Sequence, residues 1–364
     1  MEFKRLKSID IFRGLCMAWM VLNHIINWWV QSEYIWIHSI AIMIIDPIGA
    51  SGFLFISGLS VTLSYRKRLS KISETGDLNY RIIRNSYFFR AFFIFIIAII
   101  YNIPVPFVLH DPTMIWIWFV LLTAAISLFL AWPLLKMLKY LRIIVAIGFV
   151  FLHLFLVSKL SPYQGEVNFF GLIFHILYNG ITQDPILIFF PFFLIGTVIG
   201  DILHESINVR KSQNLKRVLL NLLITGILLI IFGILLDYPK FLRRRSYSWI
   251  IYSIGIEFVV LSILLLLEIA NLMTTKKSYR LIFYYSYYSL TIYLAHNLLY
   301  FLFLNQLDLI SIWFAALGVF ISIGLVFRSI YKKWERKASL KAQVSRVSLK
   351  ISMKIEEILK NKKS

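Results

Sequence analysis

An apolar stretch near the start of the chain, residues 8–29, holds an aspartate, an arginine, two asparagines and a histidine. The stretch is long enough for a membrane-spanning helix, in which ionisable groups cost about 2.5–3.5 kcal/mol each on insertion scales. Arg13 and His24 are about three helical turns apart, so they share one face, and Asp10 and Asn27 lie near it. Polar side chains placed in this way usually face the interior of a helix bundle or a hydrated cavity.

Ionisable side chains from four predicted helices fall at a similar depth in the membrane, and they are His24, Asp46, Glu257 and His296. At about 1.5 Å per residue, each lies roughly 20–27 Å from the predicted cytoplasmic end of its helix. Isolated buried charges would be strongly unfavourable, so we expect these groups and Asn23 to converge on a hydrated cavity. A neutral imidazole there could act as a general base or carry an acyl group, with Asp46 or Glu257 orienting it.

Basic side chains are predicted to meet a phosphate-rich donor that enters from the cytoplasm. Two other interpretations of the layer of ionisable side chains stay open. Layers of histidine and carboxylate also serve as proton relays, as in a proton-coupled transporter or a lipid-glycan flippase, and a polar layer can be purely structural in a non-catalytic scaffold. No metal site is predicted. The residues expected at the donor site are Asp10, Arg13, Arg66, Arg68, Arg81 and Arg84.

The composition excludes a soluble protein. Of 364 residues, 59% are hydrophobic and only 15% are charged, a balance typical of an integral membrane protein. The net charge of +20 would otherwise suggest nucleic-acid binding, but most basic residues lie in short loops and in the tail, where membrane orientation explains them. The single cysteine, Cys16, excludes a disulfide framework within the chain.

Ten apolar segments of about 17–25 residues fit the thickness of a bilayer, which predicts an all-α, polytopic membrane protein with about ten transmembrane helices. A shorter apolar segment, Phe169–Tyr178, cannot span the bilayer and is predicted to be re-entrant or interfacial. The predicted spans are Ile9–Val30, Ile37–Leu63, Arg84–Tyr101, Ile115–Leu135, Ile143–Lys159, Pro185–Leu203, Val218–Leu236, Ser248–Ala270, Ile282–Leu304 and Ile310–Ser329.

The more basic loops alternate along the chain and fall on the same side as both termini. The positive-inside rule therefore places both termini in the cytoplasm, and we expect a multi-pass protein of the cell membrane. The basic cluster Lys240–Arg245 is the exception, because it falls on the outer side. It could bind an anionic ligand, be a surface cluster without function, or show that the count of helices is off by one.

Hydropathy collapses after Ser329, which divides the chain into a transmembrane domain, residues 1–330, and a tail, residues 331–364. The tail places apolar residues at helical spacing among lysines and arginines, which predicts a basic amphipathic helix on the anionic cytoplasmic leaflet. A frayed, solvated tail is the alternative. The apolar residues are Leu340, Val344, Val347, Ile351, Ile355 and Ile358.

Several segments resemble motifs of the transmembrane acyltransferase superfamily. Residues 5–15, RLKSIDIFRGL, are similar to its opening signature, and the ten residues between Arg13 and His24 match the Arg-x10-His spacing of the type-three membrane acyltransferases. The branch that the chain resembles most is the heparan-alpha-glucosaminide N-acetyltransferase catalytic family. Further matching segments are residues 53–60, FLFISGLS, residues 190–196, FPFFLIG, and residues 289–297, SLTIYLAHN.

The resemblance implies acyl-CoA, acetyl-CoA first of all, as the cytoplasmic donor, and a cavity through the membrane. It also implies acylation of a sugar or lipid-linked sugar at its amine or hydroxyl on the other face. His24 would be the catalytic candidate and Arg13 a donor-site residue. The heparan branch tends to have asparagine at the matching first-helix position and its histidine further on, so Asn23, His24 and His38 leave the choice of histidine open.

The large luminal domain of the animal enzymes is missing, so heparan itself is not expected as the acceptor. The expected partners are the lipid bilayer, acyl-CoA and a glycan acceptor, with a second copy of the chain as a candidate and without nucleic acid.

Overall fold

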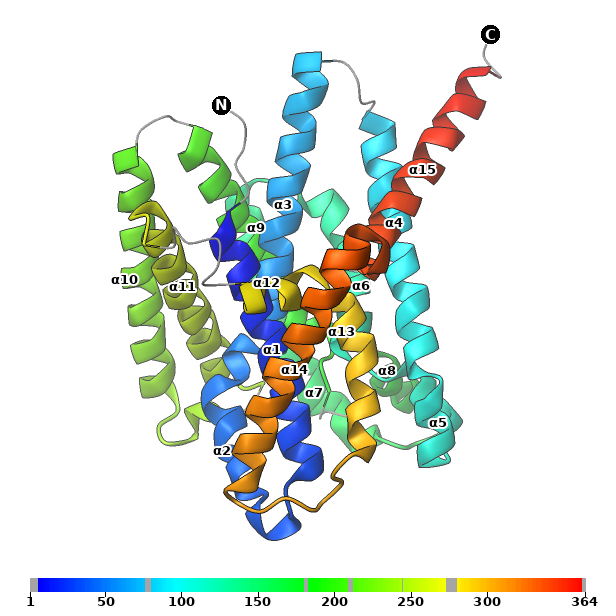
Figure 1. The fold of residues 1–364 in the computed structure, drawn as a ribbon, viewed down its shortest axis with the longest axis vertical. Coiled ribbons are helices and arrows are strands. Elements are labelled where there is room, and N and C mark those ends of the chain that lie inside the picture. Colours follow the sequence, from blue (N-terminus) through cyan, green and yellow to red (C-terminus); the bar gives the residue numbers. More distant parts are fainter. Residues whose placement is uncertain are drawn as a thin grey trace. The chain divides into compact units, whose positions relative to one another are not determined.

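The computed structural model describes residues 6–75, 80–179, 183–208, 212–243, 245–272 and 280–361. The regular elements of these residues are α-helices and short 3-10 helices, and the one β-bridge among them joins Val30 to Leu307 (Figure 1). The predicted all-α class is therefore confirmed.

Eight helices in the described part of the chain are long and apolar enough to cross a membrane. They correspond to eight of the ten predicted spans, which confirms a polytopic membrane protein. These helices are α1 (Lys7–Trp29), α3 (Ala50–Thr75), α4 (Tyr80–Asn102), α7 (Lys139–Leu160), α9 (Ile186–Asn208), α10 (Ser212–Leu236), α11 (Tyr247–Ile269) and α14 (Ser311–Trp334).

Of the two remaining predicted spans, the fourth is the shorter helix α6 (Val120–Leu134) and the ninth is broken. The second span, which contains α3, begins with α2 (Trp36–Ile45) and a 3-10 turn at Asp46–Ile48. Pro47 explains that interruption, because proline lacks a backbone N–H and restricts the residue before it. The predicted short segment is the helix α8 (Phe169–Leu177), and α5 (Pro104–Leu109) follows α4.

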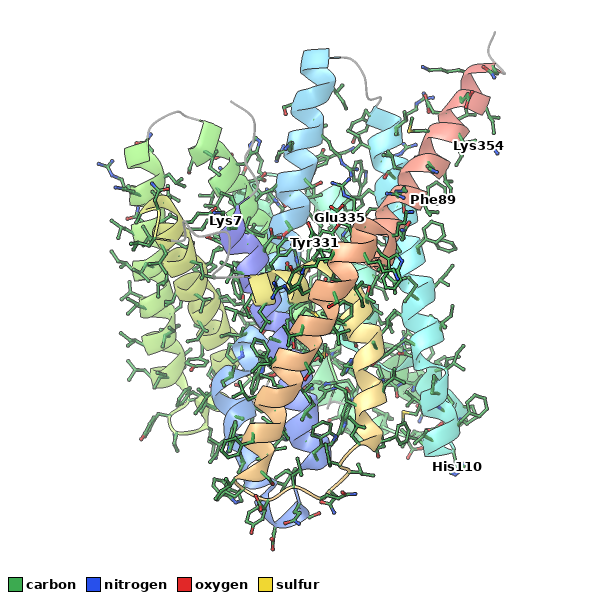
Figure 2. All side chains as sticks on the ribbon, viewed as in Figure 1. Lys7, Phe89, His110, Tyr331, Glu335 and Lys354 are labelled. Atoms are coloured by element: carbon green, nitrogen blue, oxygen red, sulfur yellow. The ribbon has the colours of Figure 1, made fainter. Side chains whose placement is uncertain are left out.

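The ninth predicted span is broken into three pieces, α12 (Arg280–Tyr287), α13 (Ser289–Ala295) and a 3-10 helix, His296–Phe301. Aromatic packing holds the first break, because rings of α12 surround Tyr331 of α14 and the Tyr288 hydroxyl donates to the carbonyl of Glu335 at 2.8 Å. Tyr331 and Glu335 are labelled in Figure 2. Hydropathy does not distinguish a straight apolar helix from a broken one, so the sequence predicts a single span here.

The chain divides into two compact units. The first comprises residues 1–56 and 205–343, and the second comprises residues 57–204 and 344–364. The border falls inside α3, so the transmembrane domain predicted for residues 1–330 contains parts of both units.

In the first unit, α1 contacts α11, α12, α13 and α14. Its N-terminus is held by Glu268 of α11, whose carboxylate oxygens accept the backbone N–H groups of Lys7 and Ser8 at 2.9 and 2.8 Å. A carboxylate is favourable there because the first N–H groups of a helix have no intrahelical acceptor. Gly14 lets α1 approach α12 closely, since a Cβ at Gly14 would lie 2.3 Å from the carbonyl oxygen of Ile282.

In the second unit, a buried ion cluster joins α3, α6, α7 and α9. Arg66 of α3 forms a bidentate pair with Asp201 of α9, at 2.7 and 3.0 Å, and also approaches the carbonyl of Leu135 after α6. Arg142 of α7, which is fully buried, donates to Oδ2 of Asp201, an oxygen that Arg66 also uses, and to the Thr197 hydroxyl. One carboxylate thus neutralises part of the charge of two arginines from different helices.

The predicted tail helix is α15 (Leu340–Asn361). Its buried stripe differs from the predicted apolar one, because Val344 is followed by Ser348, Ser352 and Glu356 at intervals of one turn. Both serine hydroxyls donate to carbonyls of their own helix at 2.7 Å, so their burial leaves no unsatisfied donor. Val347 and Ile358, which the pattern also placed on the apolar face, are exposed.

We predict that Asp201→Asn lowers the free energy of unfolding by about 3–5 kcal/mol, because it leaves two arginines without their counter-charge inside the bundle. Denaturant titration of the detergent-solubilised protein measures this change. Glu166→Gln is the matched control, since Glu166 is exposed and a surface substitution changes stability by about 0.5 kcal/mol or less. Equal stability of the two variants would show that the cluster does not hold the second unit together.

Candidate functional site

Two histidines of the first unit are in direct contact. Nδ1 of His24, on α1, lies 3.0 Å from Nε2 of His296, which begins the 3-10 helix after α13. His296 is buried and His24 is partly exposed. The two residues are 272 positions apart in the sequence, and the structure joins them because α1 packs against α13 and the segment that follows it.

A backbone carbonyl orients His296. Its Nδ1 is hydrogen-bonded to the carbonyl oxygen of Tyr293, three residues earlier. That carbonyl lies in the last turn of α13, where carbonyl groups have no intrahelical donor. The break of the helix after Ala295 therefore creates the acceptor that fixes the ring of His296.

These contacts define the tautomers of the pair. A carbonyl can only accept, so Nδ1 of His296 carries the proton, and in a neutral ring Nε2 must then be an acceptor. The hydrogen bond between the rings consequently has the Nδ1–H of His24 as its donor. This leaves the lone pair of His24 on Nε2, which is the nitrogen suited to take up a proton from another molecule.

Aromatic rings enclose the histidine pair. The indole of Trp28 stacks on His296 with an interplanar angle of 14°, and its edge meets His24 and Tyr300. A pocket adjoins these rings, and it is formed by the end of α1, the residues that follow α1 and the segment after α13. The residues that line the pocket include Asn27, Trp28, Ser32, Tyr300 and Asn305. The pocket thus has an aromatic wall and two amides, and Trp28 is the lining residue that contacts both histidines.

Asn23 precedes His24, and its buried Oδ1 has no hydrogen-bond partner among the described residues. A buried amide oxygen normally finds a donor, so this atom is suited to accept a hydrogen bond from a bound molecule.

The two predicted carboxylates lie in different environments. Glu257 is completely buried, close to the hydroxyl of Ser51 and to Cys16 of α1, which is about 12 Å along the helix from His24. Asp46 lies near His38 of α2. His296 is hydrogen-bonded to His24, because the broken helix brings its imidazole to that place.

Glu257 has no hydrogen-bond partner for either oxygen among the described residues. In the same part of the chain, no group of three or more His, Cys, Asp or Glu side chains is placed to hold a metal ion.

The predicted donor-site residues separate into distinct environments. Arg13 and Asp10 form an ion pair at 3.7 Å on α1, with both side chains largely buried. Arg66 forms an ion pair with Asp201 within the second unit, so its guanidinium group has a structural role. Arg81 and Arg84, in the first turns of α4, are exposed.

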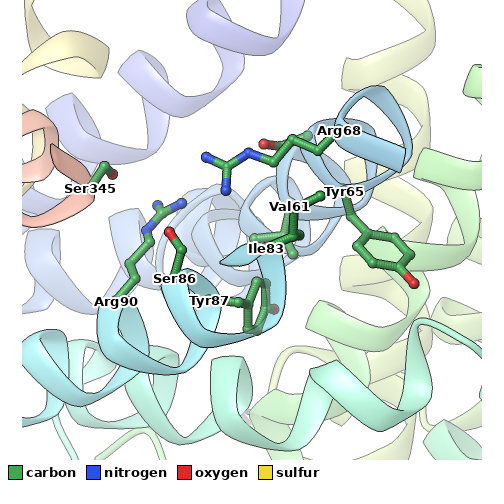
Figure 3. Close-up of a pocket in the computed structure, with 9 residues that line it drawn as sticks. Val61, Tyr65, Arg68, Ile83, Ser86, Tyr87, Arg90 and Ser345 are labelled. Carbon is green, nitrogen blue, oxygen red and sulfur yellow. The ribbon is translucent and has the colours of Figure 1, made fainter. Parts of the chain in front are cut away.

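Arg68 lines a pocket together with Arg90, which is not among the predicted donor-site residues (Figure 3). Arg90 lies inside the predicted span Arg84–Tyr101. An arginine within a membrane span is rare and often functional, so the sequence alone could have pointed to Arg90. Trp28 and Tyr300 were also missed, because an aromatic residue near the end of a span is common and carries no specific signal.

The chain matches the model of a protein family, described as an acyltransferase domain of the type-three family, over residues 6–330. The match covers the first helix with its Arg-x10-His spacing and continues through α13 into α14. It stops before α15, which is therefore additional to the family's domain. No curated protein sequence is similar enough to the chain to count as a match.

We predict that nitrogen-15 NMR of histidine-labelled protein assigns the proton of both His24 and His296 to Nδ1, since the carbonyl of Tyr293 can only accept. His296→Ala removes the acceptor for His24, so the remaining ring is expected to exchange between tautomers. His110 is exposed and serves as the internal control for an unconstrained ring. A proton on Nε2 of His296 would contradict the assigned direction of the hydrogen bond.

Proposed function

We propose that this chain, which belongs to the type-three membrane acyltransferase family, transfers an acyl group, with acetyl as the first choice, from cytoplasmic acyl-CoA. The acceptor in this proposal is a hydroxyl or amine of a sugar or a lipid-linked sugar. The observation that supports the proposal most is the contact between His24 and His296. It uses Nδ1 of His24 and so leaves the basic Nε2 of His24 for another molecule.

The proposed reaction uses His24 as the general base. Nε2 of His24 takes the proton of the acceptor's O–H or N–H group while that oxygen or nitrogen attacks the carbonyl carbon of the thioester. The new C–O or C–N bond forms, the C–S bond breaks, and the thiolate of CoA receives the proton from His24. His296 stabilises the protonated ring by accepting from its Nδ1–H, and the carbonyl of Tyr293 keeps His296 in the orientation that this requires.

The acceptor is proposed to bind in the pocket beside Trp28. A sugar ring has an apolar face that can pack on Trp28 and Tyr300, and its hydroxyl groups can bond to the amides of Asn27 and Asn305. The oxygen of Asn23 is suited to accept from the attacking hydroxyl or amine. This arrangement supports a glycan acceptor over a purely apolar one.

The donor is proposed to reach the histidines from the end of α1 that contains Arg13. The proposal makes Arg13, with Asp10 orienting its side chain, a contact for a phosphate or for the thioester region of acyl-CoA. The exposed Arg81 and Arg84 would attract the polyanionic nucleotide. Cytoplasmic termini and a place in the cell membrane belong to the same proposal, since acyl-CoA is the donor and the basic loops lie on the side of the termini.

We predict that His24→Ala leaves the protein folded and able to bind acetyl-CoA while transfer falls by about 10²–10⁴-fold, the usual loss for a general base. His296→Ala should cost less, because it removes only the group that orients His24, and Asn23→Ala should lie between them. The measurement is the transfer of radiolabel from acetyl-CoA to the glycan and glycolipid fractions of membranes that contain each variant.

His38→Ala is the control for the rival histidine, which lies on α2 near Asp46. If His38→Ala abolishes transfer while His24→Ala retains it, the base has been assigned to the wrong histidine. If His296→Ala alone is inactive, the late-helix histidine carries the chemistry.

We predict that Arg13→Ala weakens the binding of acetyl-CoA by at least about tenfold, as expected for the loss of a charge-assisted contact. Arg13→Lys should restore most of the affinity if charge alone matters and should fail if the contact is bidentate. Isothermal titration calorimetry in detergent gives both affinities. An unchanged affinity in Arg13→Ala would remove Arg13 from the donor site.

A further inference from the structure

A second group of buried polar side chains lies in the first unit, where the break between α2 and α3 meets α11. The 3-10 turn Asp46–Ile48, which forms this break, packs against α11. The carboxyl group of Glu257 on α11 is completely buried and lies close to the hydroxyl of Ser51, in the first turn of α3. Ser253 precedes Glu257 by one helical turn, so it lies on the same face of α11, and it is completely buried too.

The oxygen atoms of these three side chains are available to a ligand. Among the described residues, neither carboxyl oxygen of Glu257 and no group near the hydroxyl of Ser253 completes a hydrogen bond. The hydroxyl of Ser51 donates its one proton to the carbonyl of Pro47 at 3.1 Å, so its lone pairs can only accept. Each side chain therefore offers an oxygen lone pair to a proton or to a metal cation.

The elements around Glu257 do not supply it with a counter-charge. On α1, Cys16 is the titratable group close to Glu257, and Arg13, one turn before Cys16, is paired with Asp10. The 3-10 turn adds a second carboxyl group, that of Asp46. α10 meets this part of α11 at Gly226, and residues 218–236 of α10 contain no titratable side chain. In the described part of the chain, no basic side chain is therefore bonded to Glu257.

An ionised Glu257 without a cation would be strongly unfavourable here. The neighbouring rings of Phe55 and Phe258 have centroids 5.9 Å apart, so the surroundings are apolar and a charge is poorly screened. A proton would make the carboxyl group neutral, and Na⁺ would balance its charge. Carboxyl and hydroxyl oxygens are the ligands that hard cations prefer, and broken helices within membranes often adjoin sites for Na⁺ or protons.

We propose that the break between α2 and α3 and the facing turn of α11 form a binding site for one monovalent cation, a proton or Na⁺. The carboxyl group of Glu257 is its charged ligand, and the hydroxyl oxygens of Ser51 and Ser253 are its neutral ligands. In the proton form, the carboxylic acid donates to Oγ of Ser51. In the Na⁺ form, the carboxylate and both hydroxyl oxygens contact the ion. The site does not depend on acyl transfer, and no step of the proposed reaction uses these residues.

Infrared spectroscopy of the full-length protein in nanodiscs tests the proton form. A neutral carboxyl group has a C=O stretching band that is separate from the bands of carboxylates. We expect this band in Na⁺-free buffer and expect its loss in Glu257→Gln. Ser51→Ala should shift the band, because it removes the oxygen to which the acid donates.

Thermal unfolding in Na⁺ or in choline, at constant ionic strength, tests the Na⁺ form. A ligand that binds only the folded protein raises the midpoint, so Na⁺ should stabilise the natural protein and have no effect on Glu257→Gln. Ser253→Ala should raise the Na⁺ concentration of half-maximal stabilisation by about tenfold or more, a loss typical of groups that support a bound metal ion.

Ser262→Ala is the matched control for both serine variants. Ser262 is a buried serine of α11 whose hydroxyl also has no partner among the described residues, but it follows Glu257 by five positions and so lies on another face. It should leave the infrared band and the effect of Na⁺ unchanged.

The two forms of the site give different results. A neutral carboxyl band with a midpoint independent of Na⁺ assigns a proton, and a midpoint that rises with Na⁺ assigns Na⁺. The proposal is overturned if the natural protein shows neither result. It is also overturned if Ser51→Ala and Ser253→Ala both behave like Ser262→Ala, a comparison that holds even if Glu257→Gln does not fold.

Discussion

Every polar group inside an apolar helix bundle needs a partner within that bundle, because lipid tails offer no hydrogen bonds. The structure meets this requirement in different ways along the chain. Glu268 accepts the N–H groups at the start of α1, the tail serines bond to their own helix, and Asp201 is shared by two arginines. The buried amide oxygen of Asn23 is left open beside His24, and it marks a place where a ligand can supply the missing donor.

The break between α13 and the 3-10 helix links this requirement to chemistry. A continuous helix would use the carbonyl of Tyr293 for its own backbone, and His296 would then have no acceptor for Nδ1. Because the helix ends at Ala295, the carbonyl binds His296, His296 accepts from His24, and the basic lone pair falls on Nε2 of His24. In the proposed mechanism, this backbone irregularity and His296 orient His24, as a carboxylate orients the histidine of a Ser-His-Asp triad.

Two neighbouring arginines of the second unit show how the direction of a side chain from its helix decides what it meets. Arg66 and Arg68 are two residues apart on α3, so they point in different directions from the helix. One direction meets Asp201 and the other meets a space that also contains Arg90. The pair between Arg66 and Asp201 stabilises the packing of α3 against α9.

The sequence by itself determined the class of the protein, because the length and composition of its apolar segments admit only membrane-spanning helices, and eight of the ten predicted spans are long helices in the structure. It also placed His24 and His296 in one layer at membrane depth together with Asp46 and Glu257, since all four are ionisable. Only the tertiary structure decided that they touch, that Glu257 lies further along the bundle, and that Arg66 is occupied by Asp201. Periodicity reports which residues share a face of one helix, whereas the partner that a side chain meets depends on where helices break and how they pack. The interruption after Tyr287 and the buried stripe of α15 depend on tertiary packing in the same way, whereas the one at Pro47 follows from proline itself.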